Sequence, residues 1–351
     1  MALGIDGVRI GTWTSPDAVT GCTVVLPPDG TLGAVAVRGA APGTREAAAL
    51  GPAGHVEVCH AVVLSGSSAY GLSVADGVMS YLEVQGRGYP VGPGVVPIVG
   101  AAIVLDAGVF FPDQRPGPEQ GRTASEQATE QDPPEGAVGV GTGCTVAKVG
   151  GLDRAWRGGQ GIAVRSAGGI TVGAIVANNA VGEVIAEDGT WIARARIDPA
   201  TPRYPEVAIA APAARGSAAP GTRDDPAGPA GNTVIGCIVT DATLTKAEAH
   251  RVADLGHSGI ARALRPAHTQ VDGDALFCLA TGQVPRADRR RADDRPAGDG
   301  PTGSGPSGDA RPGSVVDLVA HLAAEAVAEA ARRGPLAAVG SQGLPGLADT
   351  P

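Results

Sequence analysis

The chain has 351 residues, which is enough for one large domain or two medium ones. Aromatic residues make up 3% of it while Gly, Ala and Val abound, so its core must be built from many small aliphatic contacts. The formal net charge of −9 argues against a nucleic-acid backbone or an anionic membrane as partner, because both require a basic face.

The N-terminal part is β-rich. Short apolar runs bounded by turn residues predict strands, and a Pro-Pro-Asp-Gly turn at 27–30 separates the first two. Apolar positions recurring every four residues predict a helix over 69–83. The predicted strands are 22–26, 33–37, 61–64, 97–99 and 101–105.

The middle of the chain alternates between polar segments and strands. Residues 114–136 are rich in Gln, Glu, Pro and Gly, which predicts an exposed, mobile insertion. Small and Pro-rich residues at 211–230 predict a flexible connector. Strands are predicted between these two segments at 146–149, 162–164 and 171–177.

The last third begins with a strand at 233–240 that is apolar on both faces, as expected where a sheet is covered on each side. Thr245 and Glu248 form a capping box that predicts the start of a helix. A buried strand follows at 275–280. The composition of 286–313 predicts disorder, and 314–333 reads as an Ala-rich helix.

Two β layers with helices that can cover them suggest an α/β fold of one domain, residues 1–351, arranged as a four-layer αββα sandwich. A doubly wound parallel sheet is the competing fold.

Thr233 stands where the predicted connector runs directly into a buried strand. If the bond between Asn232 and Thr233 breaks, Thr233 acquires a free α-amine beside its own hydroxyl, so a nucleophile and its base share one residue. The released amine has a reference pKa of roughly 8, close to working pH. Thr is also common as the opening residue of an ordinary strand.

Four further residues carry chemistry that such a nucleophile requires. Asp272 and Asp274 flank a glycine, and a carboxylate there can hold the amine of Thr233 by a charge-assisted hydrogen bond, although the triplet also suits a solvated turn. Lys148 interrupts an apolar run. It is either a cation that stabilises negative charge at the site or an edge lysine whose charged end reaches solvent. Asn179 ends a strand with Asn178, and an amide there can donate to an oxyanion or close a turn.

Other constellations fail on inspection. Cys144 fills the slot where a dinucleotide-binding GxGxxG motif needs its third glycine, and Tyr70 stands where the GxSxG serine elbow needs glycine. The six histidines show no metal-ligand spacing, so we expect neither a metal nor a cofactor. Five cysteines without a CxxC pair, and the lack of a signal peptide or membrane-length apolar run, predict a cytoplasmic protein with reduced cysteines.

Taken together, these segments resemble the DmpA-like family of self-processing aminopeptidases and amide hydrolases, which includes the nylon-oligomer hydrolases. The resemblance runs through most of the chain, outside 114–136 and the segment from 286 onward. It rests on the segments 37–39, 42–46, 64–72, 75–78, 147–149, 179–182, 231–236, 240–242, 265–269 and 272–274.

The resemblance implies a precursor that cleaves itself between Asn232 and Thr233 into chains 1–232 and 233–351. It implies Thr233 as the nucleophile, with roles for the residues that match the family's lysine, oxyanion asparagine and orienting acids: Lys148, Asn179, Asp272 and Asp274. It also implies the αββα sandwich and homo-oligomers, often tetramers. Leu105 stands where some relatives have a tyrosine near the site, which warns against copying a substrate from them.

The leading hypothesis is therefore a threonine-nucleophile amide hydrolase acting on short peptides, amino-acid amides or amino-acid oligomers through an acyl-enzyme. One alternative is a non-catalytic small-molecule-binding protein on the same scaffold. The other is a serine hydrolase that uses Ser67 or Ser68 at the strand–turn–helix junction.

Overall fold

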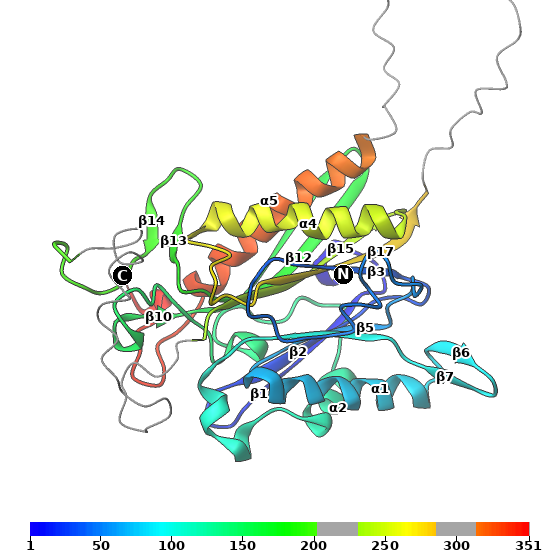
Figure 1. The fold of residues 1–351 in the computed structure, drawn as a ribbon, viewed down its shortest axis with the longest axis horizontal. Helices are drawn as coiled ribbons and strands as arrows, with labels where there is room; N and C mark the ends of the chain where they lie inside the picture. The colour runs from blue at the N-terminus through cyan, green and yellow to red at the C-terminus, as the bar shows by residue number, and fades with distance from the viewer. Residues whose placement is uncertain (202–230, 286–313, 351) are drawn as a thin grey trace, which may run out of the picture.

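The computed structural model describes residues 1–201, 231–285 and 314–350 (Figure 1). The predicted connector at 211–230 and the predicted disorder at 286–313 lie outside these residues.

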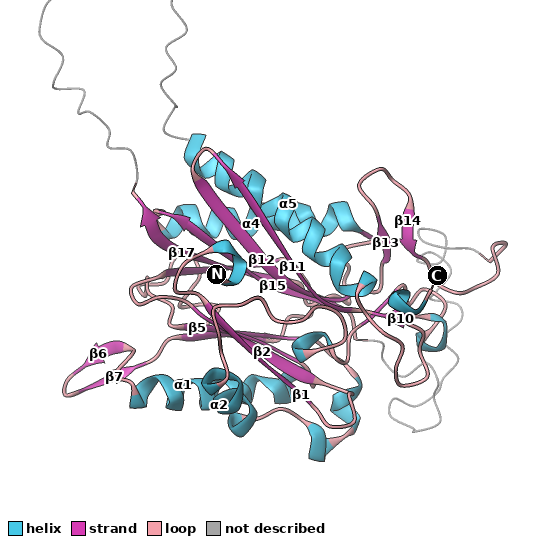
Figure 2. Cartoon of the chain, turned by 180° about the vertical axis from the view of Figure 1, so that it is seen from behind, coloured by secondary structure: helices cyan, strands magenta, loops and turns pink. Residues whose placement is uncertain are grey.

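Two five-stranded sheets lie face to face between two pairs of helices (Figures 1 and 2). The first sheet has the order β1 (Arg9–Thr14), β2 (Gly21–Leu26), β5 (Ala61–Ser65), β8 (Val99–Ile103) and β4 (Thr44–Arg45). Helices α1 (Val74–Val84) and α2 (Pro118–Glu126) cover its outer face.

The second sheet has the order β11 (Gly159–Ala167), β12 (Ile170–Asn179), β15 (Thr233–Ala242), β17 (Ala275–Val284) and β3 (Leu32–Val37). Helices α4 (Lys246–Ala263) and α5 (Ser314–Leu336) cover its outer face.

Short elements complete the described chain. A three-stranded sheet joins β14 (Trp191–Ala193), β13 (Glu183–Ile185) and β16 (Leu264–Arg265), and two strand pairs join β9 (Thr145–Val146) to β10 (Trp156–Arg157) and β6 (Tyr89–Val91) to β7 (Gly94–Val96). The 3₁₀ turns are η1 (Ala2–Gly4), η2 (Ser68–Ser73), η3 (Ala107–Phe110), η4 (Pro112–Gln114), η5 (Gly139–Gly141), η6 (Leu152–Arg154) and η8 (Leu347–Asp349).

Strand β15 shows why its sequence is apolar on both faces. Ile235, Cys237 and Val239 point into the cluster between the two sheets. The alternate residues Val234 and Ile238 point into the cluster beneath α4 and α5. Because successive side chains of a strand point to opposite faces, a strand covered on both sides needs an unbroken apolar run.

The layered arrangement confirms the αββα sandwich and excludes the doubly wound alternative. Most described strand pairs are antiparallel, including β11–β12 and β12–β15. The described parallel pairs are β15–β17 and β5–β8. The predicted turn at 27–30 does not close a hairpin, because β2 belongs to the first sheet and β3 to the second. The chain crosses between the layers there.

The segment 114–136 differs from the exposed insertion that its composition predicts. It contains α2, which packs on α1 and buries Gly121, Ala124 and Ser125. These small residues lie at i, i+3 and i+4, so they share one face of the helix. The polar residues occupy the opposite face, and composition averaged over the segment conceals this division.

All five cysteines are free and buried, as their apolar surroundings predict. Burial raises the pKa of each described thiol, for example to about 12 at Cys22. Among the helices of the described residues, none combines the length and the hydropathy that crossing a membrane would require.

Candidate active site

Thr233 and Asn179 are brought together by the pairing of two strands. Asn179 is the last residue of β12 and Thr233 is the first of β15, and the antiparallel register places them opposite each other. Both residues are almost fully buried. The pair therefore lies at one end of the second sheet, where the chain enters β15.

The Asn179 amide is held in one orientation by its neighbours. Its Oδ1 accepts hydrogen bonds from the Thr145 N–H at 2.9 Å and from Lys148 Nζ at 2.9 Å. Its Nδ2 therefore faces the other way and donates to the carbonyl oxygens of Leu105 and Gly231, each at 2.9 Å. An amide fixed in this way is a preorganised donor for a carbonyl group.

Lys148 places a second donor on the same carbonyl oxygen. Its Nζ donates to Gly231 O at 2.6 Å and also to the backbone oxygen of Asn179 at 2.9 Å. Burial lowers the pKa of this ammonium to about 7, although nearby acidic groups, including Asp272, oppose the shift. Two donors thus converge on the carbonyl that lies two residues before Thr233.

The bond between Asn232 and Thr233 has its own set of contacts. The Thr233 hydroxyl donates to the carbonyl oxygen of Asn232. That oxygen also accepts the Gly273 N–H at 3.1 Å. The hydroxyl of Thr233 therefore lies against the preceding carbonyl group, whose oxygen also receives a backbone donor.

Asp274 holds the start of β15. Its Oδ1 accepts the N–H of Val234, the residue after Thr233, at 2.7 Å, and its Oδ2 contacts the His268 ring at 2.6 Å. The carboxylate is almost fully buried, with 1% of its side chain exposed. Asp274 is thus fixed by charge-assisted hydrogen bonds beside the backbone of Thr233 and Val234.

Asp272 lies in the same loop and keeps one carboxylate oxygen unused. Its Oδ2 accepts from the N–H and the hydroxyl of Thr269, while its buried Oδ1 has no hydrogen-bond partner among the described residues. Burial, followed by repulsion from Asp274, raises the pKa of Asp272. Asp272 Oδ1 is therefore a buried acceptor that is available to a further donor.

The five residues singled out in the sequence lie in one cluster, linked through Gly231, Asn232 and the 272–274 loop. Sequence reasoning missed three groups that hold this cluster: the Gly273 N–H, the Leu105 carbonyl and the His268 ring. Leu105 also packs against Gly231, because a Cβ on Gly231 would overlap the Leu105 side chain. Backbone donors leave no trace in sequence, whereas the position of His268, six residues before Asp274, is a usable signal.

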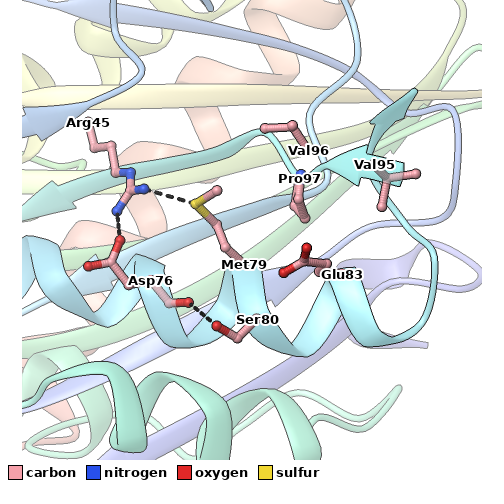
Figure 3. A pocket seen from close by; sticks show the side chains of 8 residues that line it. All are labelled: Arg45, Asp76, Met79, Ser80, Glu83, Val95, Val96 and Pro97. Atoms are coloured by element: carbon pink, nitrogen blue, oxygen red, sulfur yellow. Dashed lines mark hydrogen bonds and ion pairs between the residues drawn. The ribbon is translucent and has the colours of Figure 1, made fainter. Parts of the chain in front are cut away.

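Two other places carry no comparable chemistry. Ser67 is fully buried, and its hydroxyl contacts the Thr20 hydroxyl at 3.2 Å rather than a base. A hollow between α1 and the β6–β7 hairpin is lined by Arg45, Asp76 and Met79 among others, and none of its lining residues belongs to the Thr233 cluster (Figure 3).

With this geometry in place, the likeness to known proteins becomes specific. The sequence model of peptidase family S58 matches residues 3–347. The chain belongs to peptidase family S58. It is accordingly a member of a family of peptide and amide hydrolases, and the DmpA-like resemblance is confirmed.

Relatives with curated sequences include an uncharacterized aminopeptidase of Mycobacterium tuberculosis, which is 42% identical over 294 residues, covering 80% of this chain and 81% of the relative. A 6-aminohexanoate-oligomer endohydrolase of an Agromyces species is 31% identical over 280 residues, covering 79% of this chain and 74% of the relative.

Solved structures of similar fold include a Burkholderia β-aminopeptidase, with a TM-score of 0.67, 21% identity, and coverage of 98% of this chain and 90% of that one. The L-aminopeptidase D-Ala-esterase/amidase of Ochrobactrum anthropi, described as a variant of the Ntn-hydrolase fold, has a TM-score of 0.65, 18% identity, and coverage of 98% and 87%. Such low identities bear on the fold alone, and they agree with the αββα sandwich.

Proposed function

We propose that this S58 protein is a self-processing amide hydrolase whose nucleophile is Thr233. The observation that carries the proposal is the contact of the Thr233 hydroxyl with the Asn232 carbonyl, at a bond whose oxygen also receives the Gly273 N–H. An amide carbonyl approached by a hydroxyl and polarised by a donor is arranged for attack.

In self-cleavage, Thr233 Oγ attacks the Asn232 carbonyl carbon, and the bond from that carbon to the Thr233 nitrogen breaks. The nitrogen takes the hydroxyl proton and becomes the free α-amine, while the Asn232 acyl group remains as an ester on Oγ. Water then hydrolyses the ester, which leaves a carboxylate on Asn232 and restores the hydroxyl of Thr233.

In turnover, the amine of Thr233 accepts the proton of its own hydroxyl while Oγ attacks a substrate amide. Departure of Gly231 frees the donors Asn179 Nδ2 and Lys148 Nζ, which currently share its carbonyl oxygen. These donors stabilise the oxyanion, and the amine faces Asp272 and Asp274. Water finally releases the acyl group.

The names of the relatives support short peptides, amino-acid amides or amino-acid oligomers as the substrate class, since they describe aminopeptidases and an oligomer endohydrolase. The geometry favours Thr233 over Ser67, because the Ser67 hydroxyl contacts the Thr20 hydroxyl, whereas the Thr233 hydroxyl contacts the Asn232 carbonyl. A non-catalytic binding protein remains the outcome if the following test fails.

The test compares wild type with Thr233→Ala and Thr233→Ser. Denaturing electrophoresis and intact mass spectrometry of the wild type will show fragments 1–232 and 233–351, with a second N-terminus that begins at Thr233. Thr233→Ala will remain one chain and lose at least about 10³-fold in amide hydrolysis, because it has no nucleophile. Thr233→Ser will cleave itself. An uncleaved wild type, or cleavage and hydrolysis by Thr233→Ala, would refute the proposal.

A further inference from the structure

A chain of polar contacts runs from the Thr233 site to helix α4 through His268. Asp274 Oδ1 accepts a hydrogen bond from the Val234 N–H at 2.7 Å, and Asp274 Oδ2 lies at hydrogen-bond distance from His268 Nδ1, at 2.6 Å. On the other side of the ring, His268 Nε2 contacts the backbone oxygen of His257, on α4, at 3.3 Å. The ring thus bridges the site's buried carboxylate and the helix that covers the sheet.

The partners of His268 indicate which protonation state of its ring they favour. A carboxylate oxygen and a carbonyl oxygen are both acceptors, so each ring nitrogen must carry a hydrogen to form both contacts. A neutral imidazole carries only one N–H. The geometry therefore favours the imidazolium form, in which His268 and Asp274 make an ion pair with 1% of the Asp274 side chain exposed.

The backbone around His268 is built for this contact. The residue has a φ of +55°, in the left-handed region that side-chain-bearing residues rarely adopt. In this conformation its own N–H also donates to Asp274 Oδ2, at 3.2 Å. One carboxylate oxygen thus receives two hydrogen bonds from one residue, so strain at His268 is maintained by the interaction with Asp274.

The charged and titratable groups that face the ring come from three segments of the chain. Asp274, with Asp272 beside it, lies just before β17, and neutral His257 lies on α4 with its ring centroid 5.0 Å from that of His268. Arg38, after β3, is also near, but an ion pair at 2.5 Å with Asp254 of α4 offsets its charge.

Together, these groups favour the protonated, positively charged form of His268. Burial alone would lower the pKa of His268, but the hydrogen bond and the charge of Asp274 outweigh it and raise the pKa above its ordinary value. The neighbouring His257 is the contrast, because burial lowers its pKa to about 4 and its Nε2 contacts only a backbone oxygen, that of Ala36.

We propose that His268, in its imidazolium form, is the positioning residue of the Thr233 site: it clamps Asp274 against the start of β15 and neutralises one of the two carboxylates that will face the Thr233 amine. The proposal rests on the proposed function. His268 touches neither the scissile bond nor the nucleophile, so it acts through Asp274.

This role predicts the direction in which kcat changes with pH. As pH rises through the raised pKa of His268, the ring loses a proton and one of its two contacts, so kcat falls on the basic side. Replacing His268 by a neutral residue removes a positive charge near the amine of Thr233. The amine is then surrounded by more negative charge, its pKa rises, and the acidic limb of the kcat profile moves to higher pH.

The experiment measures kcat against pH for processed wild type, His268→Gln and His250→Gln on one amide substrate. His250 is a matched control, because it lies on α4 and its ring contacts a backbone oxygen, that of Val35, at 2.9 Å. We expect His268→Gln to lose about tenfold or more in kcat, to lose the basic limb, and to show an acidic limb displaced upward by about 0.5 to 1 pH unit. His250→Gln should keep the wild-type profile.

A second measurement does not depend on the variant being well folded, because it uses wild type alone. In the ¹⁵N spectrum of wild-type imidazoles, the His268 resonances, assigned through bonds from the backbone, should titrate with a midpoint above 6.5, the reference value for histidine.

A wild-type-shaped pH profile for His268→Gln, or a His268 midpoint at or below 6.5, would overturn this inference. If Thr233→Ala also remained active, the proposed function would fail. If Thr233→Ala is inactive, only the role of His268 is lost.

Discussion

At the scale of single residues, the two lysines of the chain are the clearest comparison. Both are buried, and both donate to several oxygens. Lys148 joins Asn179 to Gly231 beside Thr233. Lys246 instead binds three backbone oxygens of one loop, those of Ala49, Gly54 and Val56. The same ammonium group therefore connects residues of the candidate site at Lys148 and holds a loop in place at Lys246.

This contrast predicts different outcomes for the same substitution. Lys148→Met removes a donor from Gly231 and from the Asn179 side chain. The segment just before the scissile bond loses an anchor, so we expect self-cleavage to slow by about 10²-fold through misplacement. Lys246→Met leaves buried oxygens unsatisfied at about 1–3 kcal/mol each, so it should lower stability while cleaving within a few-fold of the wild-type rate. The measurement is the fraction of cleaved chain against time by denaturing electrophoresis. Equal slowing by both variants would show that Lys148 acts only through stability.

At the scale of elements, helices α4 and α5 approach each other through glycine. A Cβ added to Gly259 would overlap the backbone oxygen of Ala324 and lie 2.9 Å from the Ala328 nitrogen and 3.0 Å from the Val327 Cβ. Backbone atoms of a neighbouring helix cannot move aside as a side chain can. The contact therefore limits this position to glycine.

Gly259→Ala sets two effects against each other. Alanine gains about 1 kcal/mol of helix propensity over glycine, whereas overpacking a core costs about 1–3 kcal/mol. Because the clash is with backbone, we expect a net loss of about 1–2 kcal/mol in the free energy of unfolding. Urea denaturation in the Thr233→Ala background, where the chain stays in one piece, provides the measurement. The exposed neighbour Ser258→Ala should change stability by less than about 0.5 kcal/mol, and a Gly259→Ala variant as stable as that control would contradict the prediction.

The helices and strands also show how much of the fold the sequence predicts. Strand β15 and helix α4 were predictable because local patterns, an apolar run and a capping box, specify them. The assignment of β2 and β3 to different sheets was not, since a turn sequence does not say which neighbour a strand will pair with. Helix α2 was missed because three small buried residues carry its packing face.

The candidate site was likewise predictable from the sequence only in part. Thr233 and Asn179 were singled out by their places at strand ends and then by the resemblance, but only the register between β12 and β15 shows why they meet. The contact of Thr233 with its own preceding carbonyl and the N–H of Gly273 are backbone geometry, which no residue type encodes. His268 stood within a quoted motif, but its role depends on both ring nitrogens facing acceptors, which required the structure.

At the scale of the whole molecule, the proposed cleavage would leave both fragments sharing one sheet, and it would not separate two domains. The fragment 1–232 contributes β3, β11 and β12 to the second sheet, and the fragment 233–351 contributes β15 and β17. Strand β15 lies between β12 and β17, and β17 pairs with β3. The later fragment also supplies α4 and α5, the helices that cover this sheet.

Separation of the fragments would therefore break strand pairs on both sides and expose the apolar clusters above and below the second sheet. Burial at about 25 cal/mol per Å² of apolar surface makes that cost far larger than the entropy gained by release. We expect processed wild type to elute natively as one species whose mass is that of the 34.6 kDa chain or, if the predicted homo-oligomer forms, a multiple of it. Unprocessed Thr233→Ala should elute at the same position, and only denaturant should resolve the fragments. Size-exclusion chromatography with light scattering is the measurement, and a free 233–351 fragment under native conditions would show that this sheet does not hold the halves together.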